Sequence, residues 1–359
     1  MSTVSLCMIV KNEENNIRRC LESAKDAVDE IIIVDTGSSD RTKDICLEYK
    51  AKIYDFEWKD DFAKARNFSI DKAASDWILW MDADEELRIR NKESLKNYLE
   101  NKTTAAYSVK MLHLYGTEAE NDRQYYISYN HRLFQNGLDL CFQGAIHEKL
   151  IMDKGKEETK ICPFLEIMHY GYLEDCIGRK ALRNLKLLVK EKASGKEDPW
   201  LDYHLAAELY RLNDIERAFQ FINQAIAGFL IKGTIPPALV YKLKYDMLLH
   251  TGSMENAYKG IDKAIELYPD YVELHFYKGM VLYRMEQYED ALKAFTYCTI
   301  LGENNPDYLI RSGSGSFYAL YYIGECYTQM KKYEAAREAY RQSVLCHPQF
   351  EIAKAKFNE

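Results

Sequence analysis

Residues 77–85 read WILWMDADE, a continuous apolar run that leads directly into two carboxylates one residue apart. An uninterrupted apolar run of this kind predicts an interior strand of an α/β sheet. Open α/β sheets bind ligands in the crevice outside the carboxyl ends of their strands, so Asp82 and Asp84 are expected to face a ligand. Two hard oxygen ligands suit Mg²⁺ or Mn²⁺, which take their remaining ligands from phosphates and water. A short solvated acidic turn is the alternative interpretation of the same pattern.

The residues before this stretch alternate between predicted strands and helices. Strands are expected at residues 3–10, 30–34 and 52–56, with helices at residues 14–27 and 41–49 between them. The order β-α-β-α-β predicts a parallel sheet covered by helices on both faces. Neither G-x-G-x-x-G nor G-x-x-x-x-G-K-[ST] occurs in the chain, which argues against an ordinary dinucleotide oxidoreductase or a P-loop NTPase.

Four motifs follow one another in the first half of the chain: KNEE (residues 11–14), DEIIIVDTGSSDRT (29–42), DFAKARN (61–67) and DWILWMDADEEL (76–87). Together they resemble the nucleotide-sugar domain of family 2 glycosyltransferases, which has the GT-A fold. Within that family the chain is similar to the bacterial branch that carries helical repeats after the catalytic domain, a branch that includes enzymes glycosylating bacteriocin peptides. The resemblance implies a GT-A domain with a mostly parallel, Rossmann-like sheet, which we place at residues 1–195.

The same resemblance assigns roles at the end of the first two strands. Asp35 would accept a hydrogen bond from the uracil ring of a UDP-sugar, and Val10, Asn12 and Glu13 would line the pocket for the base and ribose. A carboxylate that faces the crevice can read an N–H on a base edge, so the chemistry agrees with this placement.

The resemblance also assigns the residues that would hold the diphosphate and the metal. Arg66 would lie beside the nucleotide, where its planar fork could pair with a phosphate or the base. A surface helix arginine is the alternative interpretation of Arg66. Asp82 would touch the ribose or the metal, and Asp84 would bind the Mg²⁺ or Mn²⁺ ion directly.

Two histidine motifs follow, FQGAIHEKL at residues 142–150 and IMHYGY at residues 167–172, and both resemble segments of the same branch. Sugar transfer with inversion needs one base that takes the acceptor proton while a metal stabilises the departing diphosphate. Glu148 is the first candidate for this base, and His147 is its competitor because its unperturbed pKa also suits the task. His169 would complete the metal site as a nitrogen ligand, although a hydrogen-bonded core histidine is an equal alternative.

From about residue 199 the sequence changes to helical segments with a repeating phrase. Ala257 and Ala291 lie 34 residues apart in matching positions, and Ala218 and Ala336 lie in two more copies of the phrase. These segments resemble tetratricopeptide repeats, so we expect an all-α repeat domain at residues 196–359. Small residues are expected where the helices approach closely, at Gly279, Gly324, Ala225 and Ala264. An insertion at residues 302–316 contains RSGSGS and is expected to be a flexible loop from its composition.

A stack of three or four such repeats forms a solenoid with a concave groove. The groove is a natural site for a peptide or protein acceptor, and a structural role or formation of a homodimer is an equal alternative.

Composition limits the remaining choices. The net charge of −8 argues against a non-specific nucleic-acid binder. The chain has no run of about 18 apolar residues and no basic-then-apolar leader, so no membrane span is expected and the cytoplasm is the expected compartment. The nine cysteines include no C-x-x-C motif and are expected to be reduced.

The sequence therefore predicts an inverting, metal-dependent enzyme that moves a hexose from a UDP-sugar to a cysteine, serine or threonine side chain of a peptide or protein, with glucose as the first choice of sugar. Two alternatives remain open. One is a transferase acting on a cell-envelope glycan or a lipid-linked sugar. The other is a binding protein that keeps the GT-A domain as a scaffold for the repeats.

Overall fold

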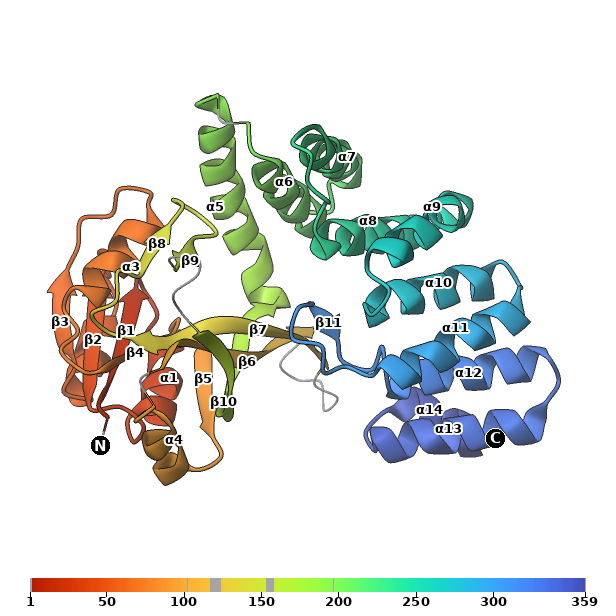
Figure 1. The fold of residues 1–359 in the computed structure, drawn as a ribbon, viewed down its shortest axis with the longest axis horizontal. Coiled ribbons are helices and arrows are strands. Elements are labelled where there is room, and N and C mark those ends of the chain that lie inside the picture. Colours follow the sequence, from red (N-terminus) through yellow and green to blue (C-terminus); the bar gives the residue numbers. More distant parts are fainter. Residues whose placement is uncertain (1, 102, 117–123, 153–157, 196, 359) are drawn as a thin grey trace. The chain divides into compact units, whose positions relative to one another are not determined.

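The computed structural model describes residues 2–101, 103–116, 124–152, 158–195 and 197–358. The chain forms two compact units, shown in Figure 1. Unit 1 comprises Met1–Leu114 and Ser128–Leu173, and unit 2 comprises Tyr115–Ile127 and Glu174–Glu359. The predicted boundary between residues 195 and 196 differs from this division, because the long helix α5 (Glu174–Ala193) belongs to unit 2.

Unit 1 is built on a mixed β-sheet whose strands run in the order β3-β2-β1-β4-β7-β6-β10-β5. Strands β1 to β4 pair in parallel, as predicted, whereas β4 pairs antiparallel with β7 and β10 pairs antiparallel with β5. The bounds of these strands are β1 (Val4–Val10), β2 (Glu30–Asp35), β3 (Lys52–Asp55), β4 (Trp77–Trp80), β5 (Glu85–Ile89), β6 (Thr104–Gly116), β7 (Gln124–Gln135) and β10 (Glu158–Leu173). A short hairpin joins β8 (Cys141–Gln143) to β9 (Lys149–Ile151).

Both faces of the parallel half of the sheet are buried, which explains its continuous apolar sequences. In β1, Leu6 and Met8 join one apolar cluster, while Cys7 between them joins the cluster on the other face. Residues of α1 (Ile17–Ala24), α2 (Thr42–Glu48) and α4 (Lys92–Tyr98) contribute to the first cluster, and α3 (Phe62–Ile70) contributes to the second. Predicted helices and strands are therefore confirmed here, with shorter helices than expected.

The register of the parallel strands sets the position of the predicted site. Val10, the last residue of β1, is opposite Asp35, the last residue of β2, and Cys7 is opposite Trp80, the last residue of β4. The carboxyl ends of three strands therefore meet at one edge of the sheet, and the loops that carry the predicted site residues start there.

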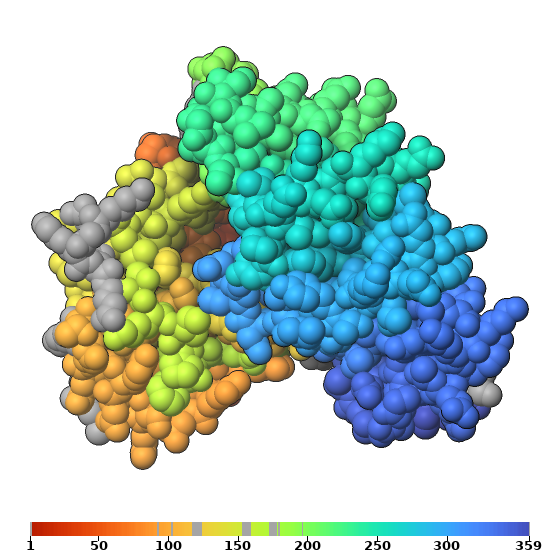
Figure 2. Space-filling view, turned by 45° about the vertical axis from the view of Figure 1, so that its right-hand side comes forward, coloured from red at the N-terminus to blue at the C-terminus, as the bar shows by residue number. Residues whose placement is uncertain are grey.

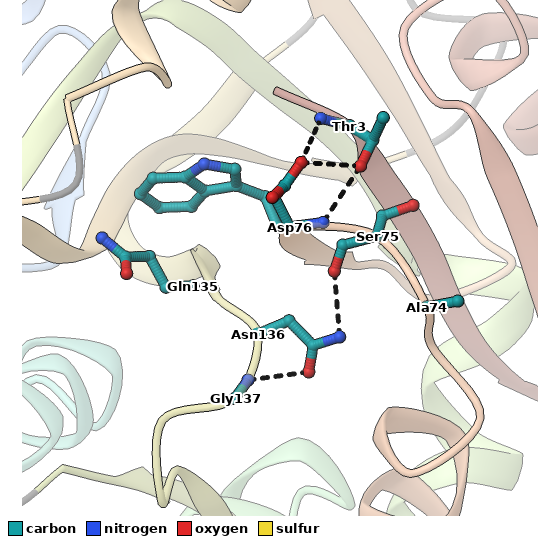
Figure 3. A pocket seen from close by; sticks show the side chains of 8 residues that line it. Thr3, Ala74, Ser75, Asp76, Gln135, Asn136 and Gly137 are labelled. Carbon is teal, nitrogen blue, oxygen red and sulfur yellow. Dashed lines mark hydrogen bonds between the residues drawn. The ribbon is translucent and has the colours of Figure 1, made fainter. Parts of the chain in front are cut away.

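A cavity of about 360 Å³ lies at the other edge, where β1 and β4 begin (Figure 3). The carboxylate Oδ2 of Asp76 accepts hydrogen bonds from the backbone N and the Oγ1 of Thr3, both at 2.9 Å. Asn136 donates through Nδ2 to the carbonyl of Ser75 at 2.9 Å. These polar groups satisfy one another and fix the turn before β4, so this cavity has a structural explanation.

Unit 2 consists mainly of consecutive helices that pack in pairs (Figure 1). The surface of residues 250–346 is cyan to blue in Figure 2. After α5 the helices are α6 (Pro199–Arg211), α7 (Ile215–Ile231), α8 (Ala238–His250), α9 (Met254–Leu267), α10 (Val272–Arg284), α11 (Tyr288–Leu301), α12 (Phe317–Gln329), α13 (Tyr333–Cys346) and α14 (Glu351–Asn358). Among the described residues, none of the helices has both the length and the apolar composition needed to cross a membrane.

The predicted small residues lie where the helices of a pair come closest. Ala225 and Ala264 are completely buried. A Cβ atom added to Gly279 would lie 2.6 Å from the ring of Phe295, and one added to Gly324 would lie 2.4 Å from the ring of Tyr340. Both distances are far shorter than van der Waals contact, so the close approach of these helices requires glycine.

Helix α8, the first helix of its repeat, contacts the start of strand β7, which also pairs with a short strand of unit 2. Strand β11 (Ile310–Arg311) pairs antiparallel with Tyr126 and Ile127, and the Nε of Arg311 donates to the hydroxyl of Tyr115 at 2.8 Å. Lys242, from α8, places its Nζ 4.7 Å from the centre of the Tyr126 ring. Part of the face formed by the first helices of the repeats is thus covered within unit 2.

The prediction of a flexible loop at residues 302–316 was wrong. Ser314 is completely buried, and its hydroxyl donates to Glu273 at 3.0 Å. The carboxylate of Glu303 accepts hydrogen bonds from the backbone of Gly313 at 2.8 Å and from the hydroxyl of Ser316 at 2.7 Å. Composition suggested mobility because it cannot reveal that the carboxylates of the buried Glu273 and the partly buried Glu303 will order a Gly/Ser segment.

Candidate active site

Asp35 is buried at the end of β2 and is held by the turn that follows it. Its Oδ2 accepts from the backbone N of Gly37 at 3.1 Å and of Ser38 at 3.0 Å, and the Nζ of Lys43 lies 3.4 Å away. Burial alone would raise the pKa of Asp35, but these hydrogen bonds and the lysine charge lower it below the usual value. The residue is therefore an ionised acceptor at the edge of the sheet, and its contact with a base remains a prediction.

The loop after β1 is tied to the same turn. Asn12 adopts a left-handed backbone conformation with φ of 54°, and its Oδ1 accepts from the backbone N of Ser39 at 2.8 Å. The backbone N of Glu13 donates to Thr42 Oγ1 at 2.7 Å. The carbonyl of Val10 accepts from the backbone N of Thr36 at 3.0 Å. Val10, Asn12, Glu13 and Asp35 are thus brought together at the carboxyl ends of β1 and β2, and their role in binding a base and ribose stays a prediction.

Arg66 lies in the site and is not a surface residue. Helix α3, capped by Asp61, buries it so that only 6% of its area is exposed. Its Nη2 donates to Asp82 Oδ1 at 2.8 Å, and its Nε forms an ion pair with Glu148. Its guanidinium lies over the ring of Trp80, with 4.2 Å between Cζ and the ring centre. Three predicted site residues from distant segments are therefore in direct contact.

This contact shifts the titration of both members of the Arg66–Asp82 pair. Burial opposes the charged form of each, but the opposite charges outweigh burial. The pKa of Asp82 is lowered by Arg66 and Arg132, and the pKa of Arg66 is raised by Asp82 and Glu148. The cluster therefore contains a fixed positive charge between two carboxylates.

The sequence analysis did not identify a second arginine–carboxylate pair, Arg132 and Glu85, next to the Asp82–Asp84 motif. Glu85 is completely buried, and Arg132 donates to its two carboxylate oxygens at 2.7 and 3.3 Å. Glu85 also accepts from the backbone N of Asp82 at 2.9 Å. Arg132 lies over Trp80, with Cζ 3.6 Å from the ring centre. Glu85 therefore supports the backbone that presents Asp82 and Asp84, and the acidic residue directly after the motif was the available signal.

His169 lies in β10, opposite Glu85 of β5, and its side chain is beside Asp84. Its Nε2 is 3.6 Å from Asp84 Oδ1, and its Nδ1 is 2.9 Å from Nδ1 of His113. Burial opposes protonation, but Asp84 outweighs it and raises the pKa of His169. Burial and the charges of His169 and Arg132 lower the pKa of His113 well below its usual range. His113 was not identified from the sequence because it belongs to no motif.

The FQGAIHE segment is anchored on α3. The side chain of Asn67 donates to the carbonyl of Phe142 at 2.9 Å and accepts from its backbone N at 2.7 Å. His147 has a left-handed φ of 51°, which directs the chain so that Glu148 reaches Arg66. The structure thus brings Glu148 into the cluster with Asp82.

Comparison with known proteins now identifies the first unit. Residues 5–154 match the family model described as Glycosyl transferase family 2, and residues 261–293 and 318–345 each match a model described as Tetratricopeptide repeat. The chain carries a family 2 glycosyltransferase domain followed by tetratricopeptide repeats.

The chain is similar to curated proteins named for one or the other of these features. A TPR repeat-containing protein of Synechococcus elongatus is 35% identical over 277 residues, which is 75% of this chain and 65% of that protein. The prophage-derived glycosyltransferase SunS of Bacillus subtilis is 30% identical over 238 residues, which is 63% of this chain and 54% of SunS. The chain therefore spans between half and two thirds of the length of these relatives. Among solved structures, a TPR protein with an unusual peptide-binding site, YrrB, covers 50% of this chain and 85% of its own, at 17% identity and a TM-score of 0.41.

Within the glycosyltransferase domain, Asp84 and His169 fit a divalent cation. Their facing Oδ1 and Nε2 atoms are 3.6 Å apart, and a carboxylate oxygen with an imidazole nitrogen suits Mn²⁺ or, with more oxygen ligands, Mg²⁺. Asp82 is engaged by Arg66, so its part in holding a cation stays a prediction. In the part of the chain that the structure describes, no cluster of three or more His, Cys, Asp or Glu side chains suited to a metal occurs.

Proposed function

We propose that this protein is an inverting, metal-dependent glycosyltransferase that moves a hexose, with glucose as the first candidate, from a UDP-sugar to a cysteine, serine or threonine side chain of a peptide or protein. The observation that supports this proposal best is the direct contact of Arg66 with both Asp82 and Glu148, beside Asp84 and His169. Basic and acidic groups meet there with the proposed metal ligands at the carboxyl edge of the sheet.

The donor would be held through its base and its diphosphate. Asp35, Val10, Asn12 and Glu13 surround the proposed uridine pocket, while Arg66 supplies a guanidinium that can pair with phosphate oxygens. When bound by Asp84 and His169, a divalent cation neutralises the negative charge of the departing diphosphate. Arg66 would add a second positive charge on the same group.

The acceptor proton would go to Glu148. As the acceptor oxygen or sulfur forms its bond to the anomeric carbon, the bond from that carbon to the UDP oxygen breaks, and the carboxylate takes the proton. Glu148 is paired with Arg66 in this structure, so we propose that the donor phosphate draws Arg66 away and leaves the carboxylate free to face the acceptor. His147 is the alternative base, since it precedes Glu148 in the same turn.

We propose the repeats as the element that selects the acceptor. Lys242 of α8 contacts Tyr126, and β11 pairs with Tyr126 and Ile127, so an acceptor would use the remaining surface of the repeat helices. A homodimer is a second proposed role, since α11 and α13 carry exposed Ile300, Tyr333 and Leu345. Transfer to a cell-envelope glycan or a lipid-linked sugar, and a purely binding role, are the rival functions.

One experiment separates these functions. The full chain is incubated with UDP-glucose, with and without Mn²⁺, and release of UDP is measured in the presence of candidate peptides containing Cys, Ser or Thr. Metal-dependent UDP release together with a hexose mass increment on the peptide is expected. Release without peptide modification would favour a glycan or lipid acceptor. No release, and no shift in melting temperature with UDP and Mn²⁺, would favour the binding protein.

A further inference from the structure

Four side chains form a continuous line of polar contacts away from the proposed cation site. His169 Nε2 faces Asp84 Oδ1 at 3.6 Å, His169 Nδ1 lies 2.9 Å from His113 Nδ1, and His113 Nε2 lies 2.8 Å from Ser128 Oγ. The residues come from the loop before β5 and from β10, β6 and β7, all within unit 1. The two imidazole rings meet edge to face, with 5.2 Å between their centres and an angle of 80° between their planes.

The contact between the two Nδ1 atoms restricts where hydrogens can be. A neutral imidazole has one N–H and one lone pair, and a hydrogen bond between two ring nitrogens needs a single hydrogen between them. When Nδ1 of His169 donates, Nδ1 of His113 must accept, and the hydrogen of His113 is then on Nε2, where Ser128 Oγ accepts it. The lone pair of His169 is then on Nε2, which is the nitrogen that faces Asp84.

We propose that His113, supported by Ser128, is a positioning residue that fixes the ring and the tautomer of His169 so that its Nε2 can ligate a divalent cation together with Asp84. This inference rests on the proposed function. Hydrogen-bond partners of metal-bound histidines commonly act in this way, because they hold the ring orientation and strengthen the ligand. A role in the packing of the sheet alone would not require the Nδ1–Nδ1 contact.

The chain contains a matched histidine–serine pair that lacks this connection. His131 on β7 places its Nδ1 3.0 Å from Ser108 Oγ on β6, and its carbonyl accepts from Trp80 Nε1 at 2.8 Å. His131 is partly buried on the same sheet, as His113 is. Substitutions at His131 and Ser108 therefore control for the loss of a buried ring or hydroxyl.

The test measures cation binding and not only turnover. Binding of Mn²⁺ to the full chain in the presence of UDP is measured by calorimetry, and the visible absorption of bound Co²⁺ reports nitrogen ligation. His113→Phe should weaken Mn²⁺ by about 10- to 100-fold and alter the Co²⁺ spectrum. His131→Phe should leave both near wild type. His113→Gln, whose amide oxygen can accept from Nδ1 of His169, should recover much of the affinity.

Serine variants keep the inference testable if His113→Phe does not fold. Ser128→Ala should weaken Mn²⁺ several-fold, and Ser108→Ala should not. Wild-type Mn²⁺ affinity in both His113→Phe and Ser128→Ala, with loss of affinity in His169→Ala, would refute the role of His113 and leave the proposed function standing. If the wild-type chain binds neither Mn²⁺ nor Co²⁺ with UDP present, the metal-dependent function and this inference both fail.

Discussion

Arg66 donates to Asp82 through Nη2 at 2.8 Å, although the two residues belong to different motifs, Arg66 on helix α3 and Asp82 in the loop between β4 and β5. The same guanidinium pairs with Glu148 through Nε, so one buried cation balances two carboxylates. Burying a guanidinium costs free energy unless opposite charges and hydrogen bonds compensate it. The cluster is therefore stable as a unit, and removal of any member leaves the others poorly compensated.

We expect Arg66→Met to destabilise the protein. Removing one partner of a buried pair typically costs 3–5 kcal/mol, and here about 3 kcal/mol is expected because the Asp82 side chain is one-third exposed. Denaturant unfolding of unit 1, followed by tryptophan fluorescence, measures this loss. Arg66→Lys should recover part of the stability but not donor binding, because an ammonium lacks the planar fork with which a guanidinium pairs with two phosphate oxygens.

The exposed Arg18–Glu48 pair is the control for Arg66. Arg18 also donates to two carboxylate oxygens, at 2.7 and 3.0 Å, but both side chains are about half exposed. Arg18→Met should have little effect on unfolding, since surface ion pairs contribute little. Equal destabilisation by the two substitutions would show that the burial of Arg66 has no energetic importance.

Asp84→Ala should abolish the part of UDP binding that depends on Mn²⁺ and leave the fold intact. Asp84 is proposed as a direct ligand, and its loss removes a charged oxygen from the cation. Calorimetry with UDP, with and without Mn²⁺, separates the two contributions. His169→Ala should weaken the same metal-dependent part, while a wild-type Mn²⁺ effect in Asp84→Ala would exclude this residue as a ligand.

Local sequence signals predicted the residues at the carboxyl ends of the parallel strands. An apolar run predicts a strand, and the carboxylate that follows it marks the point at which the strand ends at the edge of the sheet. They did not predict Arg132 or His113. Arg132 is 47 residues from Glu85, and His113 is 56 residues from His169, across antiparallel pairings whose order the sequence does not specify. The spacing of polar residues along β6 and β7 does not show which of them pair with a buried residue and which face the solvent.

Asp35→Asn should reduce stability by about 1–3 kcal/mol at neutral pH, because the hydrogen bonds from Gly37 and Ser38 lose a charged acceptor. The folded-state pKa of Asp35 is below its unfolded value of about 3.9. The ionised side chain therefore contributes stability above about pH 4, and this contribution is lost as the pH falls through the lower folded-state pKa. Unfolding free energies of the variant and the wild type should consequently converge in acid.

The same variant tests the uridine pocket. Asp35→Asn should weaken binding of UDP, because an amide nitrogen replaces one acceptor oxygen. Asp26→Asn is the control, since Asp26 is exposed on the turn after α1. Unchanged UDP affinity in Asp35→Asn would remove the proposed contact with uracil, and a stability difference that persists in acid would contradict the titration of Asp35.

Glu148→Gln should retain UDP-sugar binding and lose transfer to the acceptor. The amide cannot take a proton, and removal of a general base typically costs 10²- to 10⁴-fold in rate. The loss should be smaller with a cysteine acceptor than with serine, because a thiol ionises more readily. Product formation with matched Cys and Ser peptides measures both effects. Wild-type transfer in Glu148→Gln, with loss in His147→Ala, would reassign the base to His147.

Gly279→Ala should destabilise the repeats without changing donor binding. The added Cβ would lie 2.6 Å from the Phe295 ring, and this ring is completely buried, so α10 and α11 must separate to accept a methyl group. Overpacking of this kind costs about 1–3 kcal/mol. Gly178→Ala in α5 is the matched control, because a Cβ there has no neighbour within 4 Å and alanine favours the helix. Thermal unfolding of both variants, with UDP affinity measured in parallel, should show a lower melting temperature for Gly279→Ala alone. An unchanged melting temperature would mean that Phe295 can rotate away and that glycine is not required for this helix approach.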